Sequence, residues 1–190
     1  MSLNKLFLFF ALLIFSLTYS AWAQLVGHNN NLELSRIDSK NIQCVLSVNL
    51  LQLLHQVLSP QSSYADFLQS FAELSDADMD KALDKLTKAL TAKSFLTLPE
   101  GAQLSFKLWQ LPSKQLIRDA IKVSLVMVHM PPNAASHLDP MLVQARFTGK
   151  LPISRVQLQL HPALLPVFVT NKDDKFWLTR EIPMAILDIN

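Results

Sequence analysis

The stretch Asn41–Leu58 (NIQCVLSVNLLQLLHQVL) contains the change of hydrophobic period that decides the fold. In its first half apolar and polar residues alternate, so every second residue from Ile42 lies on one face of an extended chain. From Leu50 the apolar residues follow helical spacing, and Asn49 is placed to cap the helix. The stretch therefore predicts a half-buried strand that runs directly into a short helix.

Helical spacing continues from this point to about residue 92. Ser63 and Ser75 each precede an apolar stripe as N-cap residues, and Ser75 with Asp78 resembles a capping box. Beyond Ser75, Met and Leu side chains form one face of a long helix, while Asp and Lys side chains form the other. We expect a helical block at about residues 50–92.

Strand patterns lie on both sides of this block. Residues 32–48 and 167–179 each predict a hairpin, and 104–108, 141–147 and 156–160 alternate in the manner of one-faced strands. Residues 114–120 predict one or two helical turns, and the apolar run Val123–Met130 predicts a strand buried on both faces. The order of segments predicts an α+β fold, mainly an antiparallel β-sandwich with the helical block inserted.

The amino terminus predicts a signal peptide that covers residues 1–23. A basic Lys5 precedes an apolar core that is shorter than the roughly 20 residues of a membrane-crossing helix. Ala21 and Ala23 fit the small-residue pattern of a cleavage site, which makes Gln24 the first mature residue. The alternative is an uncleaved anchor. We expect residues 24–190 to form a single exported globular domain, periplasmic or secreted, without a transmembrane helix.

Composition excludes several classes of function. The chain carries 17 basic and 15 acidic side chains, so it lacks the basic excess that nucleic-acid binding requires. Its single cysteine, Cys44, cannot form an internal disulfide and falls on the inward face of a predicted strand, where a thiol is inert. Three glycines leave no glycine-rich phosphate loop.

Catalytic motifs are missing from the sequence as well. It contains no G-x-S-x-G or H-E-x-x-H pattern. Asp76, Asp78 and Asp80 alternate but lack the glycine and the downstream glutamate of a calcium loop, so helix-terminus charge explains them better. We expect a protein without enzymatic activity and without a resident cofactor.

One cluster suggests metal binding. Met127, His129, Met130 and His137 place thioethers near imidazoles, and such ligands suit copper, with nickel as a further candidate. On a strand, Met127 and His129 face one way and Met130 the other, so only a bend would gather them. Core packing is the alternative interpretation of these methionines.

Aromatic residues suggest a contact patch. Trp109 lies opposite the apolar face of its predicted strand, and Phe176 and Trp177 lie in the last hairpin. Aromatic side chains dominate the energetics of many protein interfaces, so either site is a candidate patch. The alternative is a core with two sides, covered by the helices.

Three segments resemble the exported region associated with HupE/UreJ-type bacterial membrane proteins. They are Leu32–Leu54 (LELSRIDSKNIQCVLSVNLLQLL), Leu98–Leu111 (LPEGAQLSFKLWQL) and Val156–Thr170 (VQLQLHPALLPVFVT), and His161 stands where that family often has a histidine. The chain departs from the family in lacking its acidic helical stretch, its later cysteines and its membrane helices. The resemblance implies an accessory role at the outer face of the inner membrane, linked to metal uptake.

These observations predict a non-enzymatic exported accessory domain that binds a protein partner, in particular an inner-membrane protein. The alternative is a periplasmic metal-binding accessory protein that uses His and Met ligands for copper or nickel. A hydrolase would need a polar cleft, for which the sequence offers no support.

Overall fold

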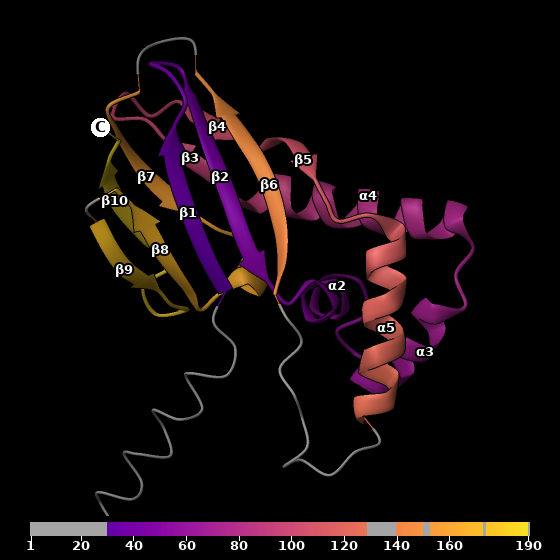
Figure 1. Cartoon of the computed structure of the whole chain (residues 1–190). Coiled ribbons are helices and arrows are strands. Elements are labelled where there is room, and N and C mark those ends of the chain that lie inside the picture. The colour runs from indigo at the N-terminus through magenta and orange to yellow at the C-terminus, as the bar shows by residue number, and fades with distance from the viewer. Residues whose placement is uncertain (1–29, 129–139, 150–152, 173, 190) are drawn as a thin grey trace, which may run out of the picture.

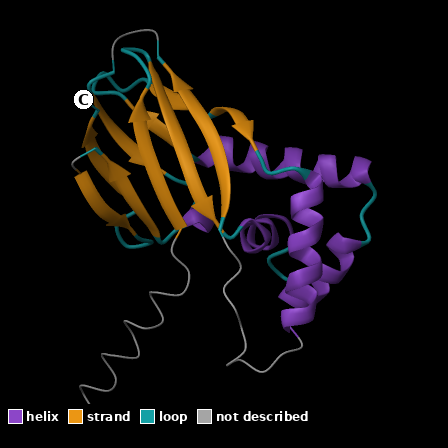
Figure 2. Ribbon diagram, in the orientation of Figure 1, coloured by secondary structure: helices purple, strands orange, loops and turns teal. Residues whose placement is uncertain are grey.

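A computed structural model describes residues 30–128, 140–149, 153–172 and 174–189 and shows two β-sheets beside a group of helices (Figures 1 and 2). The first sheet has six strands, in the order β5 (Lys107–Gln110), β6 (Met141–Thr148), β2 (Asn41–Val48), β1 (Asn30–Arg36), β8 (Val167–Asn171) and β9 (Asp174–Leu178). The second has four, in the order β10 (Met184–Asp188), β7 (Arg155–Gln159), β3 (Phe95–Thr97) and β4 (Gln103–Ser105). The helices are α2 (Leu50–Leu58), α3 (Tyr64–Ala72), α4 (Asp76–Lys93), α5 (Lys114–Val128) and the short 3-10 helix η2 (Pro162–Leu164). We call the two sheets the sandwich and helices α2–α5 the helical lobe.

The predicted fold class and helical block are confirmed. The described strands pair in antiparallel fashion except for β1 and β8, which are parallel. Helices α2 to α4 cover residues 50–93, close to the predicted 50–92. The α+β fold therefore follows from the change of hydrophobic period at Asn49.

The sandwich is held together by side chains that alternate along its strands. On β2, Cys44 pairs with Leu34 of β1 and with Ala145 of β6, and all three side chains are buried. The rings of Phe106 and Phe147 lie 3.9 Å apart between centroids, and both are at most 1% exposed. Since the alternating polar residues of β2 stay half exposed, the core lies between the two sheets.

Helices α2, α3 and α4 each begin at a predicted N-cap residue. Asn49 Oδ1 accepts the Gln52 backbone N–H at 3.1 Å. The Ser63 and Ser75 hydroxyls each accept the N–H three residues on, at 3.1 Å. Each side chain satisfies a backbone donor that has no partner within its helix, which explains why the helices begin at these positions.

The predicted strand over Val123–Met130 is wrong, because residues up to Val128 belong to helix α5. Ile117, Ile121 and Ser124 recur at helical spacing and form its buried side. A continuous apolar run is compatible with either a buried strand or a helix. Here the helical spacing that begins at Ile117, before the run, continues into it. Val123 faces water at 47% exposure, which a strand buried on both faces would not allow.

The alternation over 104–108 also does not form one strand. The chain changes sheets at Phe106, so β4 joins the four-stranded sheet and β5 joins the six-stranded sheet. The β5–β6 register shifts between Lys107 and Gln110, and the Trp109 ring lies 5.0 Å from that of Phe106. A bend, together with a register irregularity, therefore interrupts the expected period of two.

The helical lobe packs around α2. Helices α3 and α4 both contact α2, and α5 lies along α3. Among the described residues, no helix combines the length and apolar character that crossing a bilayer requires. In Figure 1 the lobe extends sideways from one end of the sandwich, so much of its surface is left open.

Candidate functional site

A groove opens in the helical lobe where α3 and α4 separate beside the end of α2. A turn at residues 73–75 joins α3 to α4. Each of these two helices packs more extensively against α2 than against the other helix. The groove has a volume of about 720 Å³, which is in the range of ligand-binding pockets. Its lining comprises Leu58, Ser59, Ser62, Asp66, Phe67, Ser70, Phe71, Leu74, Asp78, Lys81, Ala82 and Lys85.

The floor of the groove is apolar and firmly packed. The rings of Phe67 and Phe71 lie 5.1 Å apart, and their side chains are 5% and 4% exposed. Leu58, Leu74 and Ala82 are only half-buried and offer apolar surface to the groove. Because the rings are fixed by their neighbours, this floor is formed before any partner arrives.

Charged side chains border the groove on both walls. On α4, Asp78 accepts hydrogen bonds from Lys81 Nζ at 2.9 Å and from the Ser75 hydroxyl at 2.7 Å. The hydrogen bond from Lys81, and then that from Ser75, lowers the pKa of Asp78 below its usual value, while Asp78 raises the pKa of Lys81. Both are therefore charged at neutral pH.

Two further rim charges lie farther from the turn between α3 and α4. Asp66, on the α3 wall, accepts a hydrogen bond from the Ser63 hydroxyl at 2.6 Å. Lys85, on the α4 wall, forms no ion pair within the described part of the chain. A partner with an acidic group could therefore pair with Lys85 without breaking an existing ion pair.

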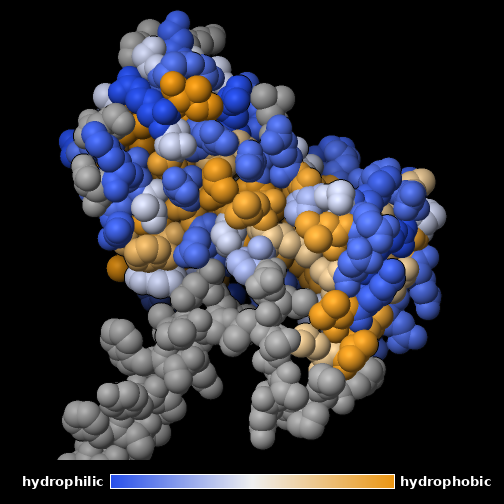
Figure 3. Space-filling view, in the orientation of Figure 1, coloured by the Kyte–Doolittle hydropathy of each residue, from blue (hydrophilic) through white to orange (hydrophobic). Residues whose placement is uncertain are grey.

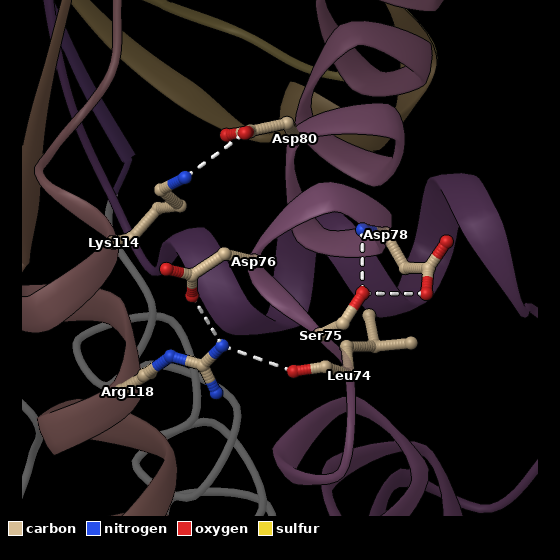
Figure 4. A network of polar contacts seen from close by, with 7 residues as sticks. All are labelled: Leu74, Ser75, Asp76, Asp78, Asp80, Lys114 and Arg118. Carbon is tan, nitrogen blue, oxygen red and sulfur yellow. Dashed lines mark hydrogen bonds and ion pairs between the residues drawn. The ribbon is translucent and has the colours of Figure 1, made fainter.

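A polar network surrounds Leu74, one of the residues that line the groove (Figure 4). Arg118 of α5 donates to the Leu74 carbonyl at 2.9 Å and to Asp76 at 2.7 Å. The Arg118 hydrogen bond, followed by the charges of Lys114 and Arg118, lowers the pKa of Asp76. Lys114 also reaches Asp80 at 2.9 Å. The network holds α5 against the turn that carries Leu74, and so it positions one end of the groove.

A buried pair of hydroxyls lies between α3 and α5. Burial raises the pKa of Tyr64, and the neighbouring Ser124 hydroxyl opposes this shift in part. Neither hydroxyl makes a hydrogen bond of good geometry with another described residue, so they are neighbours rather than a bonded pair. Tyr64 therefore stays protonated at neutral pH.

Helix α5 also exposes apolar side chains. Leu116 is 52% exposed and Val126 61%, and Figure 3 shows hydrophobic surface over the lower part of this helix. This surface was not predicted, because the apolar run in the second half of α5 was interpreted as a buried strand. The helical spacing of Ile117 and Ile121 was the signal that pointed to the exposed side.

The predicted aromatic contact residues lie at two separate sites, as the two alternative patches require. Trp109 is half-buried, and its indole N–H donates to the Thr91 hydroxyl of α4 at 2.8 Å, so it packs between sheet and helix. Phe176 packs against the core, whereas Trp177 is 36% exposed and its ring lies 5.1 Å from that of Phe168. Since β5 and β9 are opposite edges of the six-stranded sheet, Trp109 and Trp177 lie apart.

The predicted metal ligands are only partly within the described residues. Met127 is half-buried on α5, and His129, Met130 and His137 lie outside the described residues. The strand geometry assumed for Met127 is replaced by a helix. Within residues 30–128, 140–149, 153–172 and 174–189, no group of three or more His, Cys, Asp or Glu side chains is placed to hold a metal ion.

Two other sequence predictions concern reactivity and export. Cys44 is fully buried, as its place on the strand predicted, and burial raises its pKa well above the usual value. Ala21, Ala23 and Gln24, the residues of the predicted cleavage site, lie outside the described residues.

The groove itself was not predicted from the sequence. Its lining comes from α2, α3 and α4, and no short motif marks a space between three helices. No protein-family model matches the chain, and neither a curated protein nor a solved structure matches it. The resemblance to the HupE/UreJ-associated region thus stays a prediction.

Proposed function

We propose that this chain is an exported, non-enzymatic accessory domain that binds a protein partner through the groove of its helical lobe. The observation that carries the proposal is a preformed groove between charged walls, in which the half-buried Leu58, Leu74 and Ala82 offer apolar surface beside the buried rings of Phe67 and Phe71. Such a site favours binding over chemistry, because Asp66 and Asp78 are both engaged in hydrogen bonds and the pKa of Asp78 is lowered. Exposed apolar surface with a polar rim is typical of a docking site.

The occupant that fits best is an amphipathic helix of the partner. The two walls of the groove are helices, and a third helix between them would place apolar residues at i, i+3 or i+4 and i+7 against the floor. Asp66 lies on the α3 wall; on the α4 wall Lys81 is paired with Asp78, which leaves Lys85 as the cation available to a partner. The partner helix should therefore carry basic residues toward α3 and acidic residues toward α4.

The resemblance suggests where this helix comes from. It favours an extracytoplasmic segment of an inner-membrane protein, which an exported domain would meet at the outer face of that membrane. The apolar leader before Ala23 supports export.

Export is tested by sequencing the amino terminus of the protein recovered from cells. The expected first residue is Gln24, in material released from the periplasm or the medium. Full-length protein confined to the cytosol, with its initiator methionine, would contradict this part of the proposal.

Docking is tested with a photo-crosslinking residue placed at Ser70, which lines the groove, or at Gln69, its exposed neighbour on α3 that does not. Irradiation of intact cells should give one discrete protein adduct from position 70 and none from position 69. Ala82→Trp fills the groove and should abolish the adduct, whereas Ala77→Trp on the exposed start of α4 should preserve it. Equal labelling at both positions, or an adduct insensitive to Ala82→Trp, would refute groove docking.

A further inference from the structure

The groove of the helical lobe has two ends that differ in polar character. The turn that joins α3 to α4 lies at one end, where Leu74, Asp78 and Lys81 line the groove. The loop that joins α2 to α3 lies at the other end, because Ser59 caps the end of α2 and Ser63 caps the start of α3. We call these the turn end and the loop end. The lining residues at the loop end are Leu58, Ser59, Ser62, Asp66 and Lys85.

At the turn end, the charged side chains that line the groove bond to each other. Lys81 pairs with Asp78 at 2.9 Å, and the Ser75 hydroxyl also donates to Asp78 at 2.7 Å. Asp78 lies in the first turn of α4, where the partial positive charge of the helix start stabilises a carboxylate. A partner therefore gains little from an added charge at this end.

The loop end presents backbone acceptors that lack donors. Helix α2 ends there, and the last carbonyl groups of a helix have no partner within it and point along its axis beyond its end. Pro60, which follows the cap, has no N–H and cannot donate to the Gln56 carbonyl. No other described residue donates to the carbonyls of Gln56, Val57 or Leu58. The end of α2 therefore brings a partial negative charge and free acceptors to the loop end.

The Asp66 carboxylate adds further acceptors beside the end of α2. It lies in the first turn of α3, and it forms no ion pair with a described residue. The Ser63 hydroxyl donates to it at 2.6 Å, which holds the side chain in place but leaves other lone pairs open. The α2 and α3 sides of the loop end thus accept hydrogen bonds and favour positive charge.

Lys85 provides the opposite charge on the α4 wall. It lies about two helical turns beyond Asp78, and none of the ion pairs between described residues includes it. The loop end therefore combines acceptors on the α2 and α3 sides with a cation on the α4 side.

The two ends of a partner helix would meet this arrangement differently. A helix N-terminus offers backbone N–H groups without partners, a partial positive charge and commonly an acidic residue in its first turn. Its N–H groups match the α2 carbonyls and Asp66, and its acidic residue matches Lys85. A helix C-terminus would instead place free carbonyls against those of α2, and two facing acceptors leave each other without a donor.

We propose, on the basis of the proposed function, that the partner helix lies in the groove with its amino terminus at the loop end, against the carboxyl end of α2. The two helices are then placed head to tail, so that their dipoles attract each other. The bound helix should carry an acidic residue in its first turn, on the side of Lys85.

The direction of the bound helix is tested by photo-crosslinking in intact cells from both ends of the groove, at Ser62 in one variant and at Lys81 in another. Mass spectrometry of each adduct identifies the captured residue of the partner. The residue captured from position 62 should come earlier in the partner's sequence than the residue captured from position 81. The reverse order, or the same residue from both positions, would overturn the direction and leave groove docking supported. Absence of an adduct from both positions would contradict the proposed function, and the direction with it.

The charge match at the loop end is tested with Asp66→Asn, which keeps an acceptor for the Ser63 hydroxyl but removes the charge. This variant should lower the yield of the adduct from position 70 about two- to fivefold, the range expected for one charge at a helix terminus. Glu73→Gln is the matched control, because Glu73 is exposed at the other end of α3 and does not line the groove. Equal yields from the two variants would overturn the proposed direction.

Discussion

The sandwich and the helical lobe are stabilised in different ways. In the sandwich, side chains from both sheets alternate into one core, as the fully buried Phe106 and Phe147 show. In the lobe, ion pairs cover the surface and a groove stays open between helices. Of the ion pairs between described residues, Arg155–Asp188 lies on the sandwich and the others lie on the lobe. The comparison leads us to expect that the sandwich provides most of the stability, while the lobe carries the proposed binding surface.

Phe147→Ala should have the largest effect, because it opens a cavity between the two sheets. Phe147 is 0% exposed, and truncation of such a ring costs about 3–5 kcal/mol of unfolding free energy. Urea unfolding followed by circular dichroism measures the loss. Leu142→Ala, on the same strand but 57% exposed, should change stability by less than about 0.5 kcal/mol.

If the sandwich carries the stability of the whole chain, Phe147→Ala should also lower the stability of the lobe helices. The contrary result is a separate unfolding transition of the helices, at the same urea concentration as in the parent protein. That result would contradict the comparison, because the lobe would then be stable without the sandwich.

Arg118→Ala should have an intermediate and local effect. The Arg118 side chain is 26% exposed and links α5 to the Leu74 carbonyl, so its loss should cost about 1–2 kcal/mol. Hydrogen exchange should speed up in α5 and in the turn at 73–75, while β2 and β6 keep their protection. Lys122→Ala is the control, since Lys122 is 73% exposed and its ion pair with Asp119 contributes little. Uniformly faster exchange in both regions would mean that the network supports the entire fold.

The two regions differ in how much of their structure the sequence predicts, and the reason is physical. Alternation along β2 and the caps at Asn49 and Ser75 are local signals, so the strand, the helices and the inward position of Cys44 are confirmed. The first turns of helix α5 were predicted at residues 114–120, but its second half was missed because its apolar residues cover both a buried and an exposed side, which hides the helical period. The groove was missed because it depends on the angle between helices, which is set by tertiary contacts.

The side chains that join the two regions show the same contrast. The half-buried Trp109 bonds across to Thr91 of α4, a contact that no pattern within either segment predicts. His161 was noted only for its place in a family resemblance. In the structure its backbone N–H donates to the Ser94 hydroxyl at 2.9 Å, at the buried end of α4, so it links the lobe to the sandwich.

The titration of His161 should have the smallest of the predicted effects on stability. This effect arises at the junction between the lobe and the sandwich. Its Nδ1 accepts the Ala163 backbone N–H at 3.1 Å, which requires an unprotonated Nδ1. Burial, and then the charge of Lys93, lowers the pKa of His161 below its usual 6.5. Protonation is thus easier in the unfolded chain. The contribution to stability is complete above pH 6.5 and is lost as the pH falls through the lower pKa of the folded state.

His161→Asn keeps a side-chain acceptor for the Ala163 N–H but cannot titrate. The variant should therefore match the parent protein near pH 7 and lose less stability than the parent as the pH falls to about 5. Unfolding free energies across this range measure the difference, and an NMR titration assigns the pKa to the His161 ring. A ring that titrates at or above 6.5 would show that the junction is open to water, and the two regions would then be less tightly joined than the Ser94 contact indicates.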